Sequence, residues 1–167
     1  KALAKLVSSA AERRKRGLTV VEGVHLVESC LKAGHVVASL VVRDSAAGNA
    51  EVTRLLARAG TVSVARLPDK LFDAVSTLPS PSGILAVVAT PSGRPVPAHA
   101  RFCLLLEDIQ DPGNVGTLLR SAAAAGVEHV LLSPTCAFAW SPKVLRAGQG
   151  AHFALNIAEP ADLAGFL

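Results

Sequence analysis

The segment that decides the fold of this protein is DPGNVGTLLRSAAAAG, residues 111–126. It follows an apolar run, FCLLLE (residues 102–107), and precedes a second one, VEHVLLSP (residues 127–134). Short apolar runs of this kind are typical of buried strands, and we expect a helix over residues 114–126 between them. Two strands joined by a helix form a parallel pair, because the chain must cross over before it re-enters the sheet.

The predicted helix has an apolar face and a polar face. At about 100° per residue, the apolar residues lie within about 80° of Val115. They are Leu118, Leu119, Ala122, Ala123 and Gly126. The polar residues lie on the opposite side, and they are Asn114, Thr117, Arg120 and Ser121. We therefore expect the polar face to lie outward at the carboxyl ends of the strands, where open α/β sheets bind ligands.

The turn before this helix carries its own signals. Residues 111–113, Asp-Pro-Gly, predict a tight reversal, and Asn114 is expected at the N-cap, where its side chain can bind a free amide. Gly113 and Gly116 would let another backbone or a ligand approach closely.

Periodicity alone leaves a plainer interpretation open for the two polar residues. Asn114 could be only a cap, and Arg120 only a solvated side chain that pairs with Glu128 or Asp111. The segment has neither the G-x-G-x-x-G pattern of dinucleotide-binding folds nor the G-K-[ST] ending of a phosphate-binding P-loop. A nucleotide-binding oxidoreductase is therefore disfavoured.

The residues that follow continue the same α/β pattern. SPKVLRAGQG (residues 141–150) predicts a short helix with Ser141 as its N-cap and Pro142 in the first turn. HFALNI (residues 152–157) predicts a third strand. Strand, helix, strand, helix and strand indicate a Rossmann-like parallel sheet of the doubly wound type over residues 101–167.

The N-terminal half predicts a separate α/β sandwich over residues 1–90. Expected helices cover residues 1–16, 24–33, 49–59 and 69–75, and expected strands cover residues 18–21, 36–43, 61–65 and 83–89. TPSGRPVPAHA (residues 90–100) has three prolines and no apolar periodicity. We predict a linker over residues 91–100, between the two domains.

Composition and charge exclude several classes of protein. Half of the 167 residues are apolar and 18% are charged, which excludes a disordered chain. The apolar stretches are too short to span a bilayer, and no signal peptide is evident, so we expect a cytoplasmic protein without membrane contacts. Residues 1–90 carry a net charge of +5 and residues 91–167 a net charge of −1. This imbalance suggests that an anionic partner, such as nucleic acid, binds mainly to the first half.

Cysteine and methionine usage adds two expectations. Cys30, Cys103 and Cys136 are widely spaced and form no metal-ligand pattern, so we predict neither a metal site nor a disulfide. The chain contains no methionine, and we therefore expect it to be a piece of a longer protein.

Two long segments resemble a known family. LLLEDIQDPGNVGTLLRSAAAAGVEHVLLSP (residues 104–134) and SPKVLRAGQGAHFALNI (residues 141–157) are similar to the SpoU, or TrmH-like, RNA 2′-O-ribose methyltransferases of the SPOUT superfamily. RRKRGLTVVEGVHLVESCLKAG (residues 13–34) and PSGILAVVATP (residues 81–91) resemble the L30e-like RNA-binding domain of the same family.

The resemblance implies a reaction and two catalytic residues. Asn114 and Arg120 match functional residues of the family's first motif, Glu107 matches the acidic residue that closes the preceding strand, and Gly113 and Gly116 support the turn. The implied reaction transfers a methyl group from S-adenosylmethionine to a ribose 2′-hydroxyl. A guanidinium stays protonated at neutral pH, so we prefer a role for Arg120 as a clamp on the phosphate beside the target ribose.

The resemblance also implies RNA contacts. The predicted RNA-binding residues are Arg13, Arg14, Lys15, Arg16, Glu22, His25, Lys143 and Arg146. The alternatives are a solvated helix end for the first four, a capping role for Glu22 and His25, and a surface role for the last two. His152 and Phe153 also match the family, although a core position suits Phe153 better, and Ser82 departs from the family, which often has glutamine there.

The family has a further segment that this sequence lacks. In relatives, that segment threads the C-terminal trefoil knot, forms most of the S-adenosylmethionine pocket and supplies the homodimer face. We therefore predict that the SPOUT domain is incomplete here, that the cofactor residues lie mostly beyond Leu167, and that this piece alone is inactive. The expected function is RNA 2′-O-ribose methylation, with ribosomal RNA favoured over transfer RNA. The alternative is a non-catalytic RNA-binding protein with a degenerate methyltransferase domain.

Overall fold

The computed structural model describes residues 1–166. The chain divides into two compact units at the Thr90–Pro91 bond. No helix within residues 1–166 combines the length and the apolar character needed to cross a bilayer.

A four-stranded mixed sheet forms the centre of the first unit. Its strands are β1 (Leu18–Glu22), β2 (Val37–Arg43), β3 (Val64–Leu67) and β4 (Ile84–Ala89), arranged in the order β1-β4-β2-β3. β4 runs antiparallel to both of its neighbours, whereas β2 and β3 are parallel. The carboxyl ends of β1, β2 and β3 therefore share one edge of the sheet with the start of β4.

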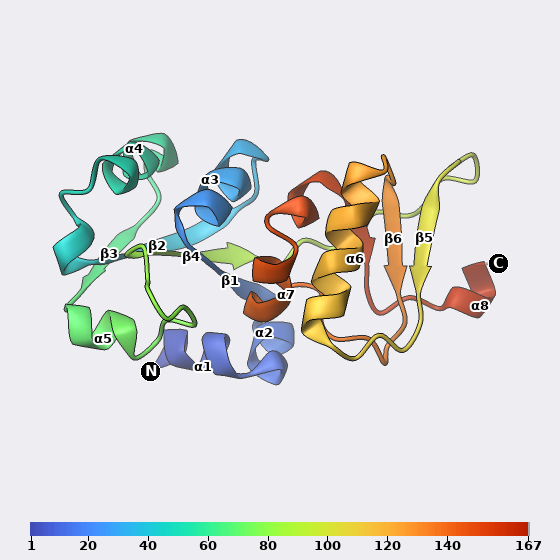
Figure 1. Ribbon diagram of the computed structural model, residues 1–167, viewed down its shortest axis with the longest axis horizontal. Coiled ribbons are helices and arrows are strands. Elements are labelled where there is room, and N and C mark those ends of the chain that lie inside the picture. The colour runs from blue at the N-terminus through green and yellow to red at the C-terminus, as the bar shows by residue number, and fades with distance from the viewer. Residues whose placement is uncertain (167) are drawn as a thin grey trace. The chain divides into compact units, whose positions relative to one another are not determined.

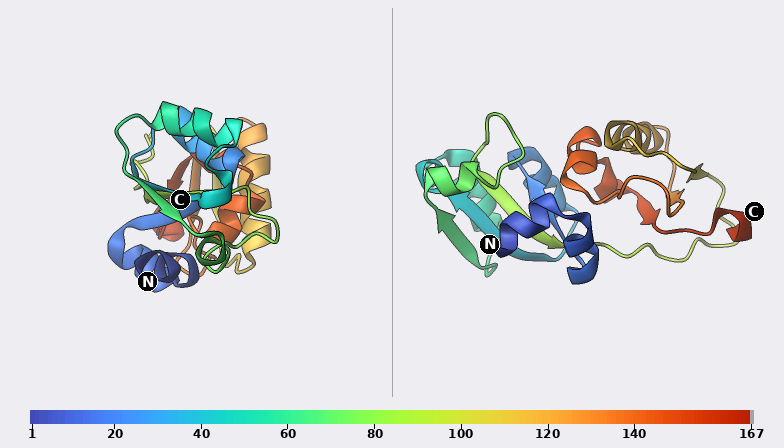
Figure 2. Two further views of the ribbon diagram at one scale, coloured as in Figure 1. Left: turned by 90° about the vertical axis from the view of Figure 1, so that its left-hand side faces the viewer. Right: turned by 90° about the horizontal axis from the view of Figure 1, so that it is seen from below.

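Helices cover both faces of this sheet (Figures 1 and 2). α1 (Ala2–Ser8), α2 (Ala10–Arg16) and α5 (Asp69–Asp73) lie on one face, and α3 (Val24–Lys32) and α4 (Ala50–Ala59) lie on the other. A short 3₁₀ helix, η1 (Asp44–Ala46), follows β2. Alternating strand residues face the two layers: Val20, Val41 and Leu85 pack with Leu6 and Phe72 beneath α1 and α5.

The basic segment at the N-terminus forms two helices instead of the single helix predicted over residues 1–16. The break lies at Ser9, which adopts an extended conformation and whose N–H donates to the Lys5 carbonyl. The Ser9 side chain then accepts a hydrogen bond from the Glu12 N–H at 3.2 Å and caps α2. Ser9-x-x-Glu12 is the sequence pattern of a capping box, which marks the start of a helix. The prediction of one continuous helix over residues 1–16 overlooked this pattern.

The second unit contains a three-stranded parallel sheet, as predicted. β5 (Cys103–Leu106), β6 (His129–Leu132) and β7 (Asn156–Ala158) lie in that order. The helices are α6 (Pro112–Ala124), α7 (Pro142–Ala147) and α8 (Leu163–Phe166). The prediction of a strand over residues 152–157 was partly wrong, because a 3₁₀ helix, η2 (Ala151–Ala154), occupies its first half.

α6 packs as its apolar periodicity predicted, with Val115, Leu119 and Ala122 buried. Gly116 is buried as well, because it lies directly against α7. A Cβ atom at Gly116 would lie 2.4 Å from the Ala147 Cβ and 2.7 Å from the Val144 carbonyl oxygen. The predicted close approach of another backbone is confirmed at Gly116, whereas Gly113 faces only the flexible Asp111 carboxylate.

The first residues of the second unit are fastened to β7. The Asn156 side chain accepts a hydrogen bond from the Arg94 N–H at 2.8 Å and donates to the Arg94 carbonyl at 2.9 Å. Its amide also lies 2.9 Å from the Nδ1 atom of His129. Gly93 lies so close to the β7 backbone that a Cβ would be 2.6 Å from the Ile157 carbonyl oxygen.

His152 is fully buried behind α7. Its Nε2 lies 2.9 Å from the Ala139 carbonyl oxygen, its ring packs against Trp140, and its Nδ1 has no hydrogen-bond partner. Nε2 therefore carries the proton and donates to Ala139, while Nδ1 stays unprotonated. Burial lowers the pKa of His152 to about 4.

Replacing Gly116 with alanine should destabilise the second unit, because the new methyl group would overlap Ala147 and Val144. We expect a loss of about 1–3 kcal/mol in the free energy of unfolding, measured by urea denaturation. Gly48→Ala is the control, since no atom lies within 4 Å of the added Cβ. An unchanged midpoint for Gly116→Ala would contradict the close helix contact.

His152 should make stability depend on pH. Its pKa is about 4 in the folded protein and near its ordinary value of 6.5 in the unfolded chain. The unfolded state therefore binds the proton more tightly, so the contribution of His152 is complete above pH 6.5 and is lost as the pH falls toward 4. The loss amounts to about 3 kcal/mol. Urea midpoints of the wild type should fall more steeply over this range than those of His152→Gln, and parallel curves would exclude the effect.

Candidate functional site

α6 begins two residues earlier than predicted. Asp111 is its N-cap, and the Asp111 carboxylate accepts a hydrogen bond from the Asn114 N–H at 2.8 Å. Pro112 occupies the first turn, which suits proline because the amide there has no helical partner. The prediction of Asn114 as the N-cap was therefore wrong, since the Asp111 carboxylate three residues upstream already binds the free amide. The Asn114 side chain is left available for another role.

Asn114 and Arg120 both lie on the exposed face of α6. They are six residues apart, so about 9 Å of helix axis separates them. Within residues 1–166, neither side chain has a hydrogen bond or an ion pair, and the pairing of Arg120 with Glu128 or Asp111 does not form. The packed helix α6 thus fixes the backbone positions of Asn114 and Arg120, and the polar atoms of both side chains are unused within residues 1–166.

A cleft of about 400 Å³ lies at the N-terminus of α6, and we call it the helix-start cleft. Its lining residues are Asp111, Pro112, Gly113, Lys143, Arg146, Ala147 and Gln149. α7 places the two cations there: Ser141 caps α7 by accepting from the Val144 N–H at 3.3 Å, as predicted, and Pro142 follows in the first turn. Two of the predicted RNA-binding residues, Lys143 and Arg146, therefore meet the start of α6.

A second cleft of about 520 Å³ lies at the carboxyl ends of β5 and β6, and we call it the strand-end cleft. Its lining residues are Glu107, Ser133, Pro134, Pro160, Ala161, Asp162, Leu163 and Ala164. Glu107 is exposed here, directly after β5. Within residues 1–166, no cluster of three or more His, Cys, Asp or Glu side chains is placed to hold a metal ion.

Arg13 is not placed to contact RNA, contrary to the prediction. Its side chain is 6% exposed, and its guanidinium donates to the carbonyl oxygens of Leu6 at 2.7 Å and Val7 at 2.9 Å. These carbonyls lie in the last turn of α1, where carbonyl oxygens have no N–H partner within the helix. Burial, together with repulsion from Arg14, lowers the pKa of Arg13. Arg13 therefore ties α2 to α1.

The other three cations of this segment are exposed. Arg14, Lys15 and Arg16 lie in the last turn of α2, and Gly17 ends the helix in the left-handed conformation with φ of 59°. Arg16 also pairs with Glu12 one turn back, at 3.2 Å. The exposed cations of α2 thus form a basic patch in the first unit, and we call Arg14, Lys15 and Arg16 the α2 patch.

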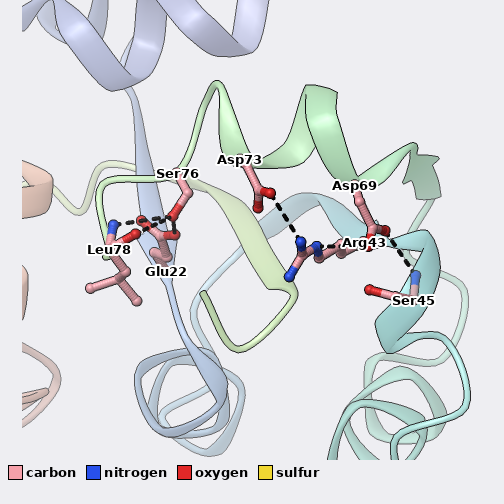
Figure 3. A network of polar contacts seen from close by, with 7 residues as sticks. All are labelled: Glu22, Arg43, Ser45, Asp69, Asp73, Ser76 and Leu78. Carbon is pink, nitrogen blue, oxygen red and sulfur yellow. Dashed lines mark hydrogen bonds and ion pairs between the residues drawn. The ribbon is translucent and has the colours of Figure 1, made fainter. Parts of the chain in front are cut away.

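Glu22 has a structural role in the first unit (Figure 3). It is buried at the end of β1, and its carboxylate accepts hydrogen bonds from the Ser76 hydroxyl and from the Thr77 N–H (2.8 Å) and hydroxyl (2.7 Å). Its carboxylate is thus used to hold the loop that precedes β4, and the predicted RNA contact of Glu22 is not supported. His25, three residues on, is exposed in the first turn of α3.

A second polar group holds the same edge of the first sheet. Arg43, at the end of β2, pairs with Asp69 at 3.3 Å and with Asp73 at 2.9 Å (Figure 3). Asp69 also accepts a hydrogen bond from the Ser45 N–H at 3.0 Å. α5 is therefore held against the end of β2 by charge as well as by Phe72.

Three further residues were missed by sequence reasoning. Ser82 accepts a hydrogen bond from the Val24 N–H at 3.2 Å and so caps α3, whose own N-cap residue is a glycine. Asp108 and Gln149 adopt left-handed backbone conformations, with φ of 54° and 51°. Non-glycine residues in this region cluster at functional sites, and these two lie beside the strand-end and helix-start clefts. Positive φ values at such residues leave no signal in the sequence.

Comparison with known proteins connects both units to one family. The model of the SpoU rRNA Methylase family matches residues 101–167, and that of the MRM3-like substrate binding domain matches residues 1–86. The chain is 37% identical to the 23S rRNA (guanosine(2553)-2′-O)-methyltransferase RlmP of Bacillus subtilis over 147 residues, which is 87% of this chain and 56% of that relative. It is 39% identical to the mitochondrial rRNA methyltransferase 3 of Mus musculus, over 91% of this chain and 37% of that relative.

Solved structures show the same fold. A TrmH-family protein from Porphyromonas gingivalis superposes with a TM-score of 0.77 at 32% identity, over 94% of this chain and 59% of that one. The SpoU methyltransferase AviRb of Streptomyces viridochromogenes, solved in complex with AdoMet, has a TM-score of 0.80 at 24% identity, over 94% of this chain and 59% of that one. The chain thus spans about a third to a half of the curated relatives it matches. It belongs to the SpoU methylase family and carries an MRM3-like substrate binding domain ahead of its SpoU segment.

Proposed function

We propose that this chain is part of an S-adenosylmethionine-dependent methyltransferase that acts on a ribose 2′-hydroxyl of ribosomal RNA. The main support for the proposal is the pair Asn114 and Arg120 on α6, the helix that follows β5. Both side chains are exposed and have no partners within residues 1–166. Relatives at 37–39% identity are named as rRNA methyltransferases, and RlmP is named as a 2′-O enzyme. The domain assignment of residues 1–90 and 101–167, with a linker over residues 91–100, belongs to this proposal.

Arg120 acts as a clamp on the RNA backbone. Its guanidinium stays protonated and offers several donors in one plane, which suits a bidentate contact with the phosphate beside the target ribose. Asn114 offers both a donor and an acceptor to the sugar, about two turns closer to the start of α6. Methyl transfer from a sulfonium to a hydroxyl depends mainly on alignment, so two side chains that bind the ribose and its phosphate contribute by orienting the ribose.

The strand-end cleft suits the methyl donor. Its volume of about 520 Å³ lies within the range of small-molecule sites, and it opens at the carboxyl ends of parallel strands. Glu107 would bind hydroxyl or ammonium groups there, and Ser133 would line the opposite wall. When bound, S-adenosylmethionine supplies an activated methyl group on a cationic sulfur, and the Glu107 carboxylate favours that charge.

Phosphate contacts are proposed at both units. In the second unit, Lys143 and Arg146 line the helix-start cleft, where the free amides of α6 also favour an anion. In the first unit, the α2 patch supplies three cations, and the exposed His25 completes the proposed contacts. Arg13 and Glu22 are left out, because both are buried and bonded within the protein.

We further propose that the whole protein works as a homodimer in the cytoplasm. The bacterial relative RlmP supports a cytoplasmic location, although other relatives are named as mitochondrial.

Removing the Arg120 guanidinium should abolish methylation without unfolding the protein. Arg120→Ala should lower kcat by at least about a hundredfold, and Asn114→Ala by about tenfold or more, because each removes a group that fixes the reacting ribose. Transfer of radiolabelled methyl groups to ribosomal RNA measures this. Arg101→Ala, an exposed arginine outside α6, is the control and should keep full activity. The assay uses the whole protein, since this piece alone is expected to be inactive. Near-normal turnover of Arg120→Ala would refute the assignment, and RNA binding by an inactive whole protein would favour a non-catalytic protein.

Neutralising the α2 patch should weaken RNA binding in a salt-dependent way. Each phosphate contact that is lost should reduce the slope of log affinity against log salt by about 0.7–0.9, so a triple alanine variant should flatten it by about 2. The control is a triple variant of Lys32, Arg54 and Arg58, which removes the same charge from α3 and α4. Equal flattening in both variants would show that net charge, and not the α2 patch, attracts the RNA.

A further inference from the structure

We infer that Ser133 and Cys136 are positioning residues that set the loop between β5 and α6. They belong to the turn that follows β6, residues 133–137, and the loop comprises residues 107–111. β5 and β6 are parallel, so this turn and this loop leave the sheet at the same edge (Figure 1). The inference rests on the proposed function, because the loop leads directly to the helix that carries Asn114 and Arg120.

The two side chains bind the backbone of the loop at successive residues. The Asp108 N–H donates to the Ser133 hydroxyl at 3.1 Å, and the Ile109 N–H donates to the Cys136 sulfur at 3.4 Å. The Cys136 thiol in turn donates to the Leu106 carbonyl at 3.3 Å. The Cys136 thiol therefore acts as a hydrogen-bond donor and acceptor at the same time. An alanine side chain at this position could do neither.

Backbone contacts of the turn complete the arrangement. The Ser133 N–H donates to the Leu106 carbonyl at 3.0 Å, and the Ala137 N–H donates to the Ile109 carbonyl at 2.8 Å. Both polar backbone groups of Ile109 are thus bound by the turn. The Thr135 hydroxyl lies 3.0 Å from that of Ser133 and orients it.

The loop needs such support because its conformation is unfavourable on its own. Asp108 has φ of 54°, a left-handed conformation that costs a non-glycine residue free energy and persists only where neighbours impose it. This conformation directs the chain from the end of β5 toward Asp111, the N-cap of α6. If the loop relaxed, the start of α6 would shift relative to Glu107, because the Asp108 turn lies between them.

A purely structural role for the turn would affect stability alone. A positioning role predicts in addition that kcat falls while the KM for RNA stays constant, since RNA affinity depends on cations of α2 and α7 outside the loop and alignment depends on the loop. It also predicts that variants keeping the hydrogen-bonding groups retain activity. Cys136→Ser and Ser133→Thr are such variants.

The first test measures hydrogen exchange at the Asp108 and Ile109 amides. Ser133→Ala should speed exchange at Asp108, and Cys136→Ala at Ile109, each by roughly fivefold or more. Cys103→Ala removes a half-buried thiol in β5 that makes no contact with the loop amides, and should leave both rates unchanged. Unchanged rates in the Ser133 and Cys136 variants would overturn the inference. This test does not depend on any enzymatic activity.

The second test compares kcat and KM in the methylation assay for the same variants. The inference predicts a loss of about tenfold to a hundredfold in kcat for Ser133→Ala and Cys136→Ala, with recovery in Ser133→Thr and Cys136→Ser. The KM for RNA should stay within about twofold of wild type. Faster exchange with an unchanged kcat would overturn it. Should Cys136→Ala fail to fold, Ser133→Ala decides the question. Inactivity of the whole wild-type protein would refute the proposed function, and the exchange rates alone would then decide whether Ser133 and Cys136 set the loop.

Discussion

The parallel pairing of β5 with β6 is the constraint on which the second unit depends. In that register Leu104 lies beside Val130 and Leu106 beside Leu132, so both strands end at the same edge. A parallel pair requires a crossover, and α6 provides it while burying Val115 and Leu119. One face of α6 is thereby committed to the core. The opposite face, with Asn114 and Arg120, must then lie outward, close to the point where the strands end.

Buried polar groups complete both units by binding backbone that would otherwise lack partners. Glu22 holds the loop before β4, Arg13 binds the last carbonyls of α1, and Asn156 fastens the segment at Arg94 to β7. In each case a side chain replaces water at a backbone group that regular secondary structure leaves unpaired. Arg13 and Glu22, for which the family resemblance implied RNA contacts, therefore use their charged groups inside the protein. Arg14, Lys15 and Arg16, by contrast, are exposed at the surface of the first unit.

Close packing sets the geometry of the helix-start cleft. Because Gly116 has no side chain, α7 can approach α6 until Ala147 and the Val144 carbonyl lie where a Cβ would be. This approach brings Lys143 and Arg146 to the start of α6. The placement of these cations beside a helix N-terminus supports the proposed contact with an RNA backbone.

The sequence by itself determined the elements whose signals are local. Apolar periodicity identified α6 and its outward polar face, the Ser141-Pro142 pair identified α7, and the family motifs identified the fold. Tertiary structure decided the rest. It set the antiparallel direction of β4 relative to its neighbours, the capping of α6 by Asp111, and the burial of Arg13 and Glu22. The bonds from Ser133 and Cys136 to the Asp108 loop also join residues more than twenty positions apart. Such features depend on which backbone groups come into contact in the folded chain, and local residue patterns do not specify contacts between residues distant in sequence.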